Sequence, residues 1–167
     1  MGVKEHHEKA RRSVTCAVIT VSDTRTEATD SSGQRIREML ADGGHRVKSC
    51  QIVRDEPSEI EAALRRLLED RSVEAIITNG GTGISPRDTT FEVIRALLER
   101  EIDGFGELFR VLSYQDIGPA AMLSRALAGT ARGKVVVSLP GSTAAVELGM
   151  AKLVLPELGH MVFLLGG

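Results

Sequence analysis

The sequence has no tryptophan and few aromatic residues of any kind. Of its 167 residues, 3% are aromatic and 42% are hydrophobic. The core of the fold must therefore be built from Val, Ile, Leu and Ala side chains. A chain of this length suits one domain with one core. We expect a loose polar tail over residues 1–13 and a single domain over residues 14–167.

A strong excess of either charge is also missing. The formal net charge is -2 at pH 7 and the pI is about 6.1. Nucleic-acid-binding proteins usually carry a basic excess, so this balance argues against a nucleic-acid partner. The polar N-terminal stretch MGVKEHHEKARR lacks the apolar region of a signal peptide, and no apolar run approaches the length of a membrane span. We therefore expect a cytoplasmic protein with no membrane partner.

Cysteine and histidine, the usual ligands of transition metals, are scarce. Cys16 and Cys50 each lie in a strand-like run without the spacing of a metal site. That setting predicts two buried, reduced thiols. His6 and His7 are adjacent in the polar tail, where they could bind a metal or could simply be solvated.

Short β-branched runs alternate with segments of helical periodicity along the rest of the chain. Strands are expected at residues 15–21, 45–53 and 73–79, and on either side of Arg132-Gly133 within 126–141. Helices are expected at 33–44, 58–70, 89–100 and 104–114, and from Ser142 onward. The alternation predicts a mostly parallel sheet with helices on both faces. The hairpin-like turn at Arg132-Gly133 predicts one antiparallel strand.

Polar loops follow four of the expected strands. They contain Ser22-Asp23, Arg54-Asp55, Asn79–Gly83 and Pro140–Thr143. In parallel sheets, ligands bind outside the carboxyl ends of the strands. Glycines let main-chain N–H groups approach oxygen atoms, and both Gly-rich loops lead into helix N-termini, which favour phosphate. The loops together predict an anionic ligand, although either Gly-rich loop alone could be a tight turn without one.

The helices at 58–70 and 89–100 have residues of their own to cap them. Ser58 with Glu61, and Thr89 with Glu92, have the spacing of capping boxes. The aspartates that precede these helices are therefore left without an evident structural role.

These aspartates, Asp55 and Asp88, follow expected strands beside the phosphate-binding loops. Two carboxylates repel a phosphate unless a cation lies between them, and oxygen ligands predict Mg²⁺. Arg54 and Arg87 could offset the same charge, or could only be solvated at the rim. We interpret both aspartates as ligands of a divalent cation.

The best-known phosphate motifs do not fit this chain. There is no GxxxxGK[ST] segment, which excludes a P-loop, and Pro86 disrupts the GxGxxG spacing that would begin at Gly81. A phospho-receiver domain also has aspartates at strand ends. That fold needs a lysine before its late proline, and Ser138-Leu139 before Pro140 offers none.

Several motifs resemble the MoaB/MogA family of molybdenum cofactor biosynthesis. They are TVSDTRT, TDSSG, TNGGTGISPRDTT, EIDGFGELFRVLSYQDIG, LSRALAG and SLPGSTAAV. The resemblance covers residues 18 to about 160, and the LFRVLSYQDIG and PGSTAAV stretches are similar to the MoaB branch. It implies a three-layer α/β/α molybdopterin-binding fold and a homo-oligomer, either a trimer or a hexamer.

Active members of that family adenylylate molybdopterin with Mg-ATP and release pyrophosphate. By resemblance, the catalytic and Mg²⁺-binding acids are Asp55 and Asp88. The resemblance also implies contacts to molybdopterin or nucleotide from Ser22, Asp23, Gly80, Gly81, Thr82, Gly83, Ser124, Arg125, Pro140, Gly141 and Ser142. It further implies a handover of the product to a molybdenum insertase.

Some MoaB proteins are similar to this chain yet are thought to bind molybdopterin without catalysis. They lack the acid that corresponds to Asp55, so its presence here favours the adenylyltransferase over the non-catalytic alternative. Phe91 replaces a proline that many relatives have at the start of the next helix.

Two apolar segments could belong either to the core or to a subunit interface. Phe105, Leu108, Phe109 and Leu112 have helical spacing, which favours the core. The closing MVFLL stretch is open to both interpretations.

Overall fold

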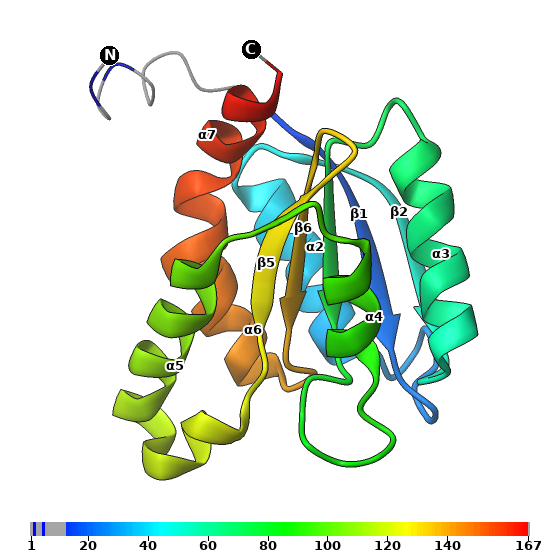
Figure 1. The fold of residues 1–167 in the computed structure, drawn as a ribbon, viewed down its shortest axis with the longest axis vertical. Coiled ribbons are helices and arrows are strands. Elements are labelled where there is room, and N and C mark those ends of the chain that lie inside the picture. Colours follow the sequence, from blue (N-terminus) through cyan, green and yellow to red (C-terminus); the bar gives the residue numbers. More distant parts are fainter. Residues whose placement is uncertain (1, 3–4, 6–12, 167) are drawn as a thin grey trace.

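The computed structural model describes residues 2, 5 and 13–166. Residues 13–166 contain a six-stranded sheet with helices on both of its faces (Figure 1). His6, His7 and most of the expected 1–13 tail lie outside the described residues. The strand order is β2-β1-β3-β6-β5-β4.

The sheet is mostly parallel, as predicted. Its strands are β1 (Thr15–Val21), β2 (Arg46–Val53), β3 (Ala75–Asn79), β4 (Arg100–Glu101), β5 (Leu127–Ala131) and β6 (Lys134–Leu139). The pairs β1–β2, β1–β3 and β3–β6 are parallel, whereas β5 is antiparallel to both β6 and β4. Only β5 therefore runs against the other described strands. The two-residue strand β4 was not predicted, because its sequence continues the periodicity of the helix before it.

The β5–β6 hairpin turns at the predicted place. Arg132 has φ 48° and Gly133 has φ 71°. Two central residues with positive φ give a two-residue turn whose twist matches that of the strands.

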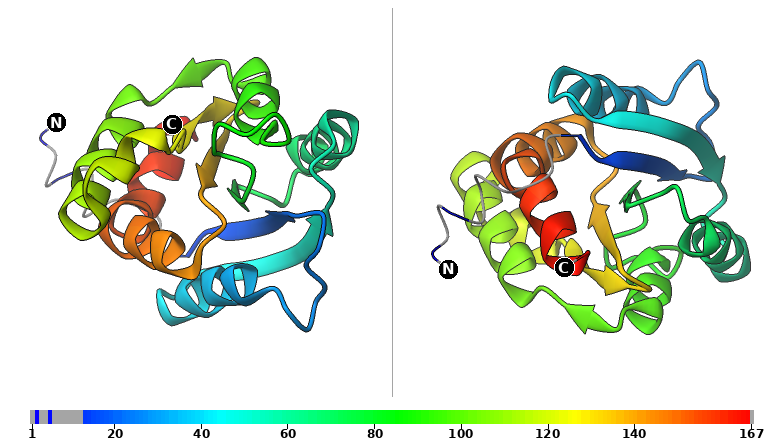
Figure 2. Two further views of the ribbon diagram at one scale, coloured as in Figure 1. Left: turned by 90° about the horizontal axis from the view of Figure 1, so that it is seen from below. Right: turned by 90° about the horizontal axis from the view of Figure 1, so that it is seen from above.

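The helices form two layers. Their bounds are α2 (Ser31–Asp42), α3 (Pro57–Glu69), α4 (Thr90–Leu97), α5 (Asp103–Ile117), α6 (Thr143–Gly149) and α7 (Leu155–Leu165). A 3₁₀ segment (Gly118–Leu123) follows α5, and a π-helical segment (Met150–Val154) joins α6 to α7. Helices α2, α5, α6 and α7 share one core with the sheet, and α3 and α4 share the other (Figure 2). The expected three-layer α/β/α sandwich is therefore confirmed.

The two cysteines lie in different environments, which corrects half of the prediction. Cys16 is fully buried in the interior strand β1, and burial raises the pKa of its thiol to about 12. Cys50 is exposed because β2 is at the edge of the sheet. Partial burial still raises the pKa of Cys50.

Thr143–Leu165 is, among the described residues, the one helical run long and apolar enough to span a membrane by length and composition. This corrects the expectation that no apolar segment approaches that length. One side of the run packs against the sheet through residues spaced every fourth position, namely Val146, Met150, Val154, Leu158 and Val162. Its apolar composition thus serves the core, and of the closing MVFLL stretch Val162 is buried whereas Leu164 is exposed.

Helix α5 divides its apolar residues between the core and the surface. Phe105 and Phe109 are buried, as their spacing predicts. Leu108 is 55% exposed, so of the two alternatives this residue does not belong to the core that its spacing favoured.

Candidate functional site

The loops that follow β1, β2, β3 and β6 meet at one edge of the sheet, at the bottom of Figure 1. Gly80 has φ 99°, and a Cβ atom built on it would lie 2.2 Å from the carbonyl oxygen of Val21. A Cβ atom on Gly141 would lie 3.2 Å from Cα of Gly80. The N–H of Asp55 donates to Oδ1 of Asp23 at 3.1 Å. The four loops therefore come together as the sequence predicts.

A buried polar network fixes the start of α2 behind these loops. The Asn79 side chain donates to Oγ1 of Thr20 and accepts from the Ser32 hydroxyl, at 3.0 and 2.8 Å. The Thr20 hydroxyl in turn donates to the Asp30 carboxylate at 2.7 Å, and Asp30 caps α2 by accepting from the N–H of Gly33. Sequence reasoning missed this network, although an aspartate followed by two serines is a typical helix start.

Asp55 is buried, with 7% of its surface exposed, and its two oxygens differ. Oδ1 accepts from both the N–H and the hydroxyl of Thr89, at 3.2 and 2.9 Å. Asp55 therefore does have a structural role, which the sequence did not reveal. Oδ2 accepts no hydrogen bond from the described residues and lies 3.0 Å from a Cβ atom built on Gly81. One oxygen is anchored, and the other faces the glycine loop.

The hydroxyl of Thr90 lies beside this free oxygen. It is buried and without a hydrogen-bond partner among the residues that the structure describes. A Cβ atom on Gly81, whose φ is 69°, would lie 2.1 Å from Oγ1 of Thr90. The glycine thus leaves its main chain close to an unpartnered hydroxyl and a free carboxylate oxygen. Such a pair of hard oxygen atoms fits Mg²⁺ or a water bound to it.

Asp88 belongs to the same loop, between β3 and α4. Its Oδ2 accepts from the N–H of Ser85 at 2.9 Å and would lie 2.7 Å from a Cβ atom on Gly83. This hydrogen bond gives Asp88 a local structural role that the sequence did not predict. Because Asp55 binds Thr89, the residue after Asp88, the two acids flank one loop.

The described residues contain no group of three or more His, Cys, Asp or Glu side chains that could hold a metal. Two carboxylates alone do not complete the six-ligand shell of Mg²⁺. Substrate phosphate and water would have to supply the remaining oxygen ligands, as is usual for Mg²⁺ in nucleotide sites.

Neither predicted capping box forms. Helix α3 begins at Pro57 without a side-chain cap, and Glu61 pairs with Arg65. The Thr89 hydroxyl bonds to Asp55 instead of capping α4. Helix α3 already begins before Ser58, and in α4 the Asp55 carboxylate takes the hydroxyl of Thr89.

Arginines at the rim form ion pairs and are not simply solvated. Arg87 pairs with Asp23 at 2.9 Å and with Glu56 at 2.8 Å, while Arg54 pairs with Glu59 at 2.6 Å. The hydrogen bond from Arg87 is the main cause that lowers the pKa of the Asp23 carboxyl below its ordinary value of 3.8. Asp23 is therefore ionised at neutral pH, and Arg87 balances its charge beside the site.

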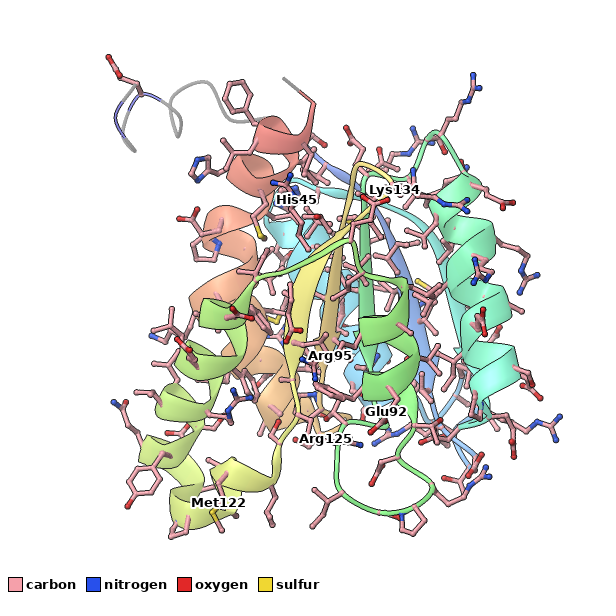
Figure 3. All side chains as sticks on the ribbon, in the orientation of Figure 1. His45, Glu92, Arg95, Met122, Arg125 and Lys134 are labelled. Carbon is pink, nitrogen blue, oxygen red and sulfur yellow. The ribbon has the colours of Figure 1, made fainter. Side chains whose placement is uncertain are left out.

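Arg125 is also turned toward the glycine loop. Its Nε donates to the carbonyl oxygen of Gly83 at 2.8 Å, its Nη2 donates to the carbonyl oxygen of Asp88 at 2.9 Å, and its Nη1 pairs with Glu92. Figure 3 shows Arg125 and Glu92 together at this end of α4.

Two predicted serines already use their hydroxyl groups within the protein. Ser22 accepts from the N–H groups of Thr24 and Arg25 at 3.2 and 3.1 Å. Ser142 accepts from the N–H of Ala145 at 3.2 Å and caps α6. Both hydroxyls could still donate to a ligand, because these bonds use only their acceptor capacity.

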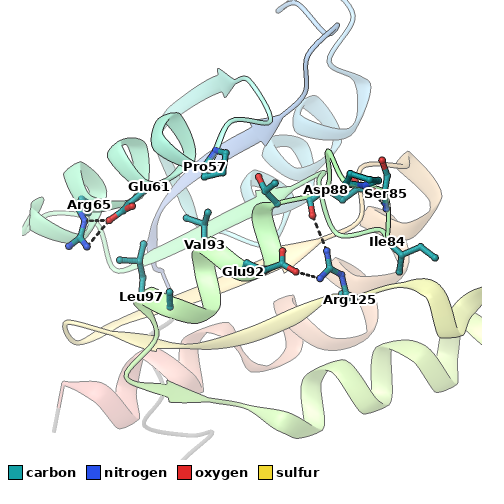
Figure 4. A pocket seen from close by; sticks show the side chains of 13 residues that line it. Pro57, Glu61, Arg65, Ile84, Ser85, Asp88, Glu92, Val93, Leu97 and Arg125 are labelled. Carbon is teal, nitrogen blue, oxygen red and sulfur yellow. Dashed lines mark hydrogen bonds and ion pairs between the residues drawn. The ribbon is translucent and has the colours of Figure 1, made fainter.

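A cavity of about 610 Å³ lies between α3 and α4 next to this loop (Figure 4). Its lining is mixed and includes Pro57, Glu61, Arg65, Ile84, Val93 and Leu97. Of the predicted site residues, Asp88 and Arg125 line it. Ser124 and Arg125 line a second cavity of about 420 Å³, and Ser142 a third of about 90 Å³. The predicted site residues that line these cavities are thus divided among three of them, and none of the three is lined by all of these residues.

Comparison with known proteins identifies the class to which this fold and loop arrangement belong. Residues 17–160 match the probable molybdopterin binding domain. The chain belongs to this family.

Whole-chain relatives narrow the assignment further. The chain is 53% identical over 164 residues to molybdenum cofactor biosynthesis protein B of Bacillus cereus, covering 98% of this chain and 97% of that one. A crystal structure of a molybdenum cofactor biosynthesis protein B is 54% identical with a TM-score of 0.90, covering 92% and 96% of the two chains. The tungsten cofactor synthesizing protein MoaB from Pyrococcus furiosus is 38% identical with a TM-score of 0.81, covering 90% and 96%. The chain is therefore similar over its whole length to molybdenum cofactor biosynthesis proteins B.

Proposed function

We propose that this protein binds molybdopterin and adenylylates it with Mg-ATP, releasing pyrophosphate, in the cytoplasm. One observation supports this most strongly. The free oxygen of Asp55, the unpartnered hydroxyl of Thr90 and the carboxylate of Asp88 border the same glycine loop. These groups suit a cation between phosphates.

The reaction requires little covalent chemistry from the protein. The terminal phosphate of molybdopterin attacks the α-phosphorus of ATP, a new P–O bond forms, and the bond to the leaving pyrophosphate breaks. A phosphate is already anionic at neutral pH, so no general base is needed. Asp55 and Asp88 would hold Mg²⁺, which when bound neutralises phosphate charge. Catalysis then comes mainly from positioning and from charge stabilisation.

The remaining loop residues would bind the two substrates. Main-chain N–H groups of Gly80–Gly83 and of the turn at Gly141 would contact phosphate oxygens or polar edges of the pterin. The same proposal places substrate contacts at Ser22, Asp23, Thr82, Ser124, Pro140 and Ser142. Arg125, for which the resemblance implies the same role, instead binds the Gly83 and Asp88 carbonyl oxygens and Glu92. Gly80, Gly81 and Gly141 suit this role because a Cβ atom at any of them would come too close to a neighbouring loop, so only a bare main chain fits there.

A pyrophosphate-release assay tests the proposal against the non-catalytic alternative. We expect release only when molybdopterin, ATP and Mg²⁺ are all present, with ATP alone as the control. Molybdopterin binding without release would favour a binding protein that passes the pterin to a partner. The presence of Asp55 with one free oxygen favours catalysis.

We also propose that the protein is a homo-oligomer, a trimer or a hexamer, that hands its product to a molybdenum insertase. Apolar residues remain exposed on α5 and on the 3₁₀ segment after it, namely Leu108, Val111, Tyr114, Ile117, Met122 and Leu123. Contiguous apolar surface of this kind usually marks a protein interface. The surface leads directly into Ser124 and Arg125, so a neighbouring subunit would lie close to the site.

A further inference from the structure

We infer that Arg125 is a positioning residue that clasps the loop from Gly83 to Asp88, and that it acts on the substrate only through this loop. The inference rests on the proposed function of the loop, because it gives a reason for holding Asp88 in place. It goes beyond that function because the positive charge of Arg125 suggests direct phosphate binding, whereas we assign this side chain to holding the loop.

The clasp consists of two hydrogen bonds from Arg125 that join the two ends of one loop. Nε of Arg125 binds the carbonyl oxygen of Gly83, and Nη2 binds the carbonyl oxygen of Asp88, at 2.8 and 2.9 Å. Between these ends the loop is exposed, and Ile84 has 68% of its surface accessible. A single guanidinium group therefore closes a loop whose tip projects into solvent.

Arg125 is itself held in place from several sides. Its main-chain N–H donates to the carbonyl oxygen of Thr82 at 2.9 Å, just before the first clasped end. Its guanidinium carbon lies 4.9 Å from the centre of the Phe91 ring, within the range of a cation–π contact. Glu92 pairs with Nη1, and the hydrogen bond from Arg125 is the main cause that lowers the pKa of Glu92. The side chain is therefore fixed before any ligand arrives.

Three of the five N–H donors of the guanidinium group are already used within the protein. Each of its three nitrogen atoms already has a protein partner. Two of these partners are main-chain carbonyl oxygens, which a substrate anion cannot replace without releasing the loop. A planar guanidinium can bind both carbonyls at once, whereas a lysine ammonium is a point charge on a flexible stem. Charge alone would thus not preserve the clasp.

Substitutions that separate charge from geometry test this inference. In Arg125→Lys the positive charge stays but the two-point contact is lost, and in Arg125→Met both are lost. Phe91→Leu removes the stacking partner and keeps the hydrogen bonds. Arg66→Lys, at an exposed position on α3, is the matched control. Amide hydrogen exchange of residues 83–88 and the kinetics of pyrophosphate release are measured for each.

We expect loop exchange to be at least about tenfold faster in both Arg125 variants, and to change less in Phe91→Leu. We expect kcat to fall about 100-fold in both Arg125 variants, because a small misplacement of a catalytic group has a cost of that order. The KM for molybdopterin should change less than threefold. Arg66→Lys should match the parent in every measurement.

The inference is overturned if Arg125→Lys keeps the parent rate of loop exchange and the parent kcat. It is also overturned if the Lys variant keeps activity and only the Met variant raises KM, since that pattern indicates a charge contact to substrate. If the parent protein releases no pyrophosphate, the proposed function fails, while the exchange measurement still decides whether the clasp exists.

Discussion

Gly81→Ala probes the crowded point of the glycine loop. Gly81 has φ 69°, and an added Cβ atom would lie 2.1 Å from Oγ1 of Thr90 and 3.0 Å from Oδ2 of Asp55. Gly44→Ala is the matched control, because Gly44 has φ 80° but nothing within 4 Å of the added atom. The two substitutions share the cost of a left-handed backbone and differ in the clash.

The expected losses of stability follow from these two terms. A non-glycine residue in the left-handed region costs about 1–2 kcal/mol, which is the expected loss for Gly44→Ala. Overpacking of a filled site costs about 1–3 kcal/mol more, so Gly81→Ala should lose about 2–5 kcal/mol. In the double variant Gly81→Ala with Thr90→Ala, the clash with the hydroxyl is absent, and the two substitutions should be coupled.

Denaturant unfolding followed by circular dichroism measures these differences, since the chain has no tryptophan for a fluorescence signal. Pyrophosphate release should be lost in Gly81→Ala and kept in Gly44→Ala. Equal unfolding midpoints for Gly81→Ala and Gly44→Ala would refute the close approach of Gly81 to Thr90. So would a double variant whose losses are the simple sum of the two single losses.

Three further predictions concern thiols, pH and assembly. One thiol, that of Cys50, should react with an aromatic disulfide reagent in the native protein, and Cys16 should react only after unfolding; two fast native thiols would contradict the burial of Cys16. Because Arg87 lowers the folded-state pKa of Asp23, this carboxylate stabilises the fold fully above pH 3.8 and progressively less as the pH falls below it. The difference in unfolding free energy between the parent and Asp23→Asn should therefore be constant near neutral pH and shrink below pH 3.8; a difference that grows on acidification would contradict the ion pair. Tyr114→Asp, at a side chain 60% exposed, should lower the molar mass measured by light scattering, and an unchanged mass would place the interface elsewhere.

Local pattern was sufficient to predict the sheet and the meeting of four polar loops at one of its edges. Runs such as Thr15–Val21, rich in β-branched residues and without a charged side chain, are typical of strands buried on both faces, and these are the interior strands of a parallel sheet. The loops after such strands must meet at one edge, so Asp55 and the glycine loop could be placed near each other before the structure was known.

Side-chain partners were not predictable, because they depend on contacts between distant segments. Thr89 and Glu92 have the spacing of a capping box, yet Asp55 and Arg125 bind them from other loops. Cys50 lies in the run RVKSCQIV, which is less apolar than the run TCAVITV around Cys16, and the strand order places it at an edge. The roles of single side chains at this site therefore came from the tertiary structure.

The most direct test of the proposed site is pyrophosphate release by Asp88→Asn at saturating Mg-ATP and molybdopterin. Asp42→Asn, at an exposed position in α2, serves as the control. We predict that Asp88→Asn folds and binds molybdopterin like the parent but turns over at least about 100-fold more slowly, because removal of one group that stabilises developing charge costs that much. Release at the parent rate would contradict the assignment of Asp88 to the Mg-ATP site.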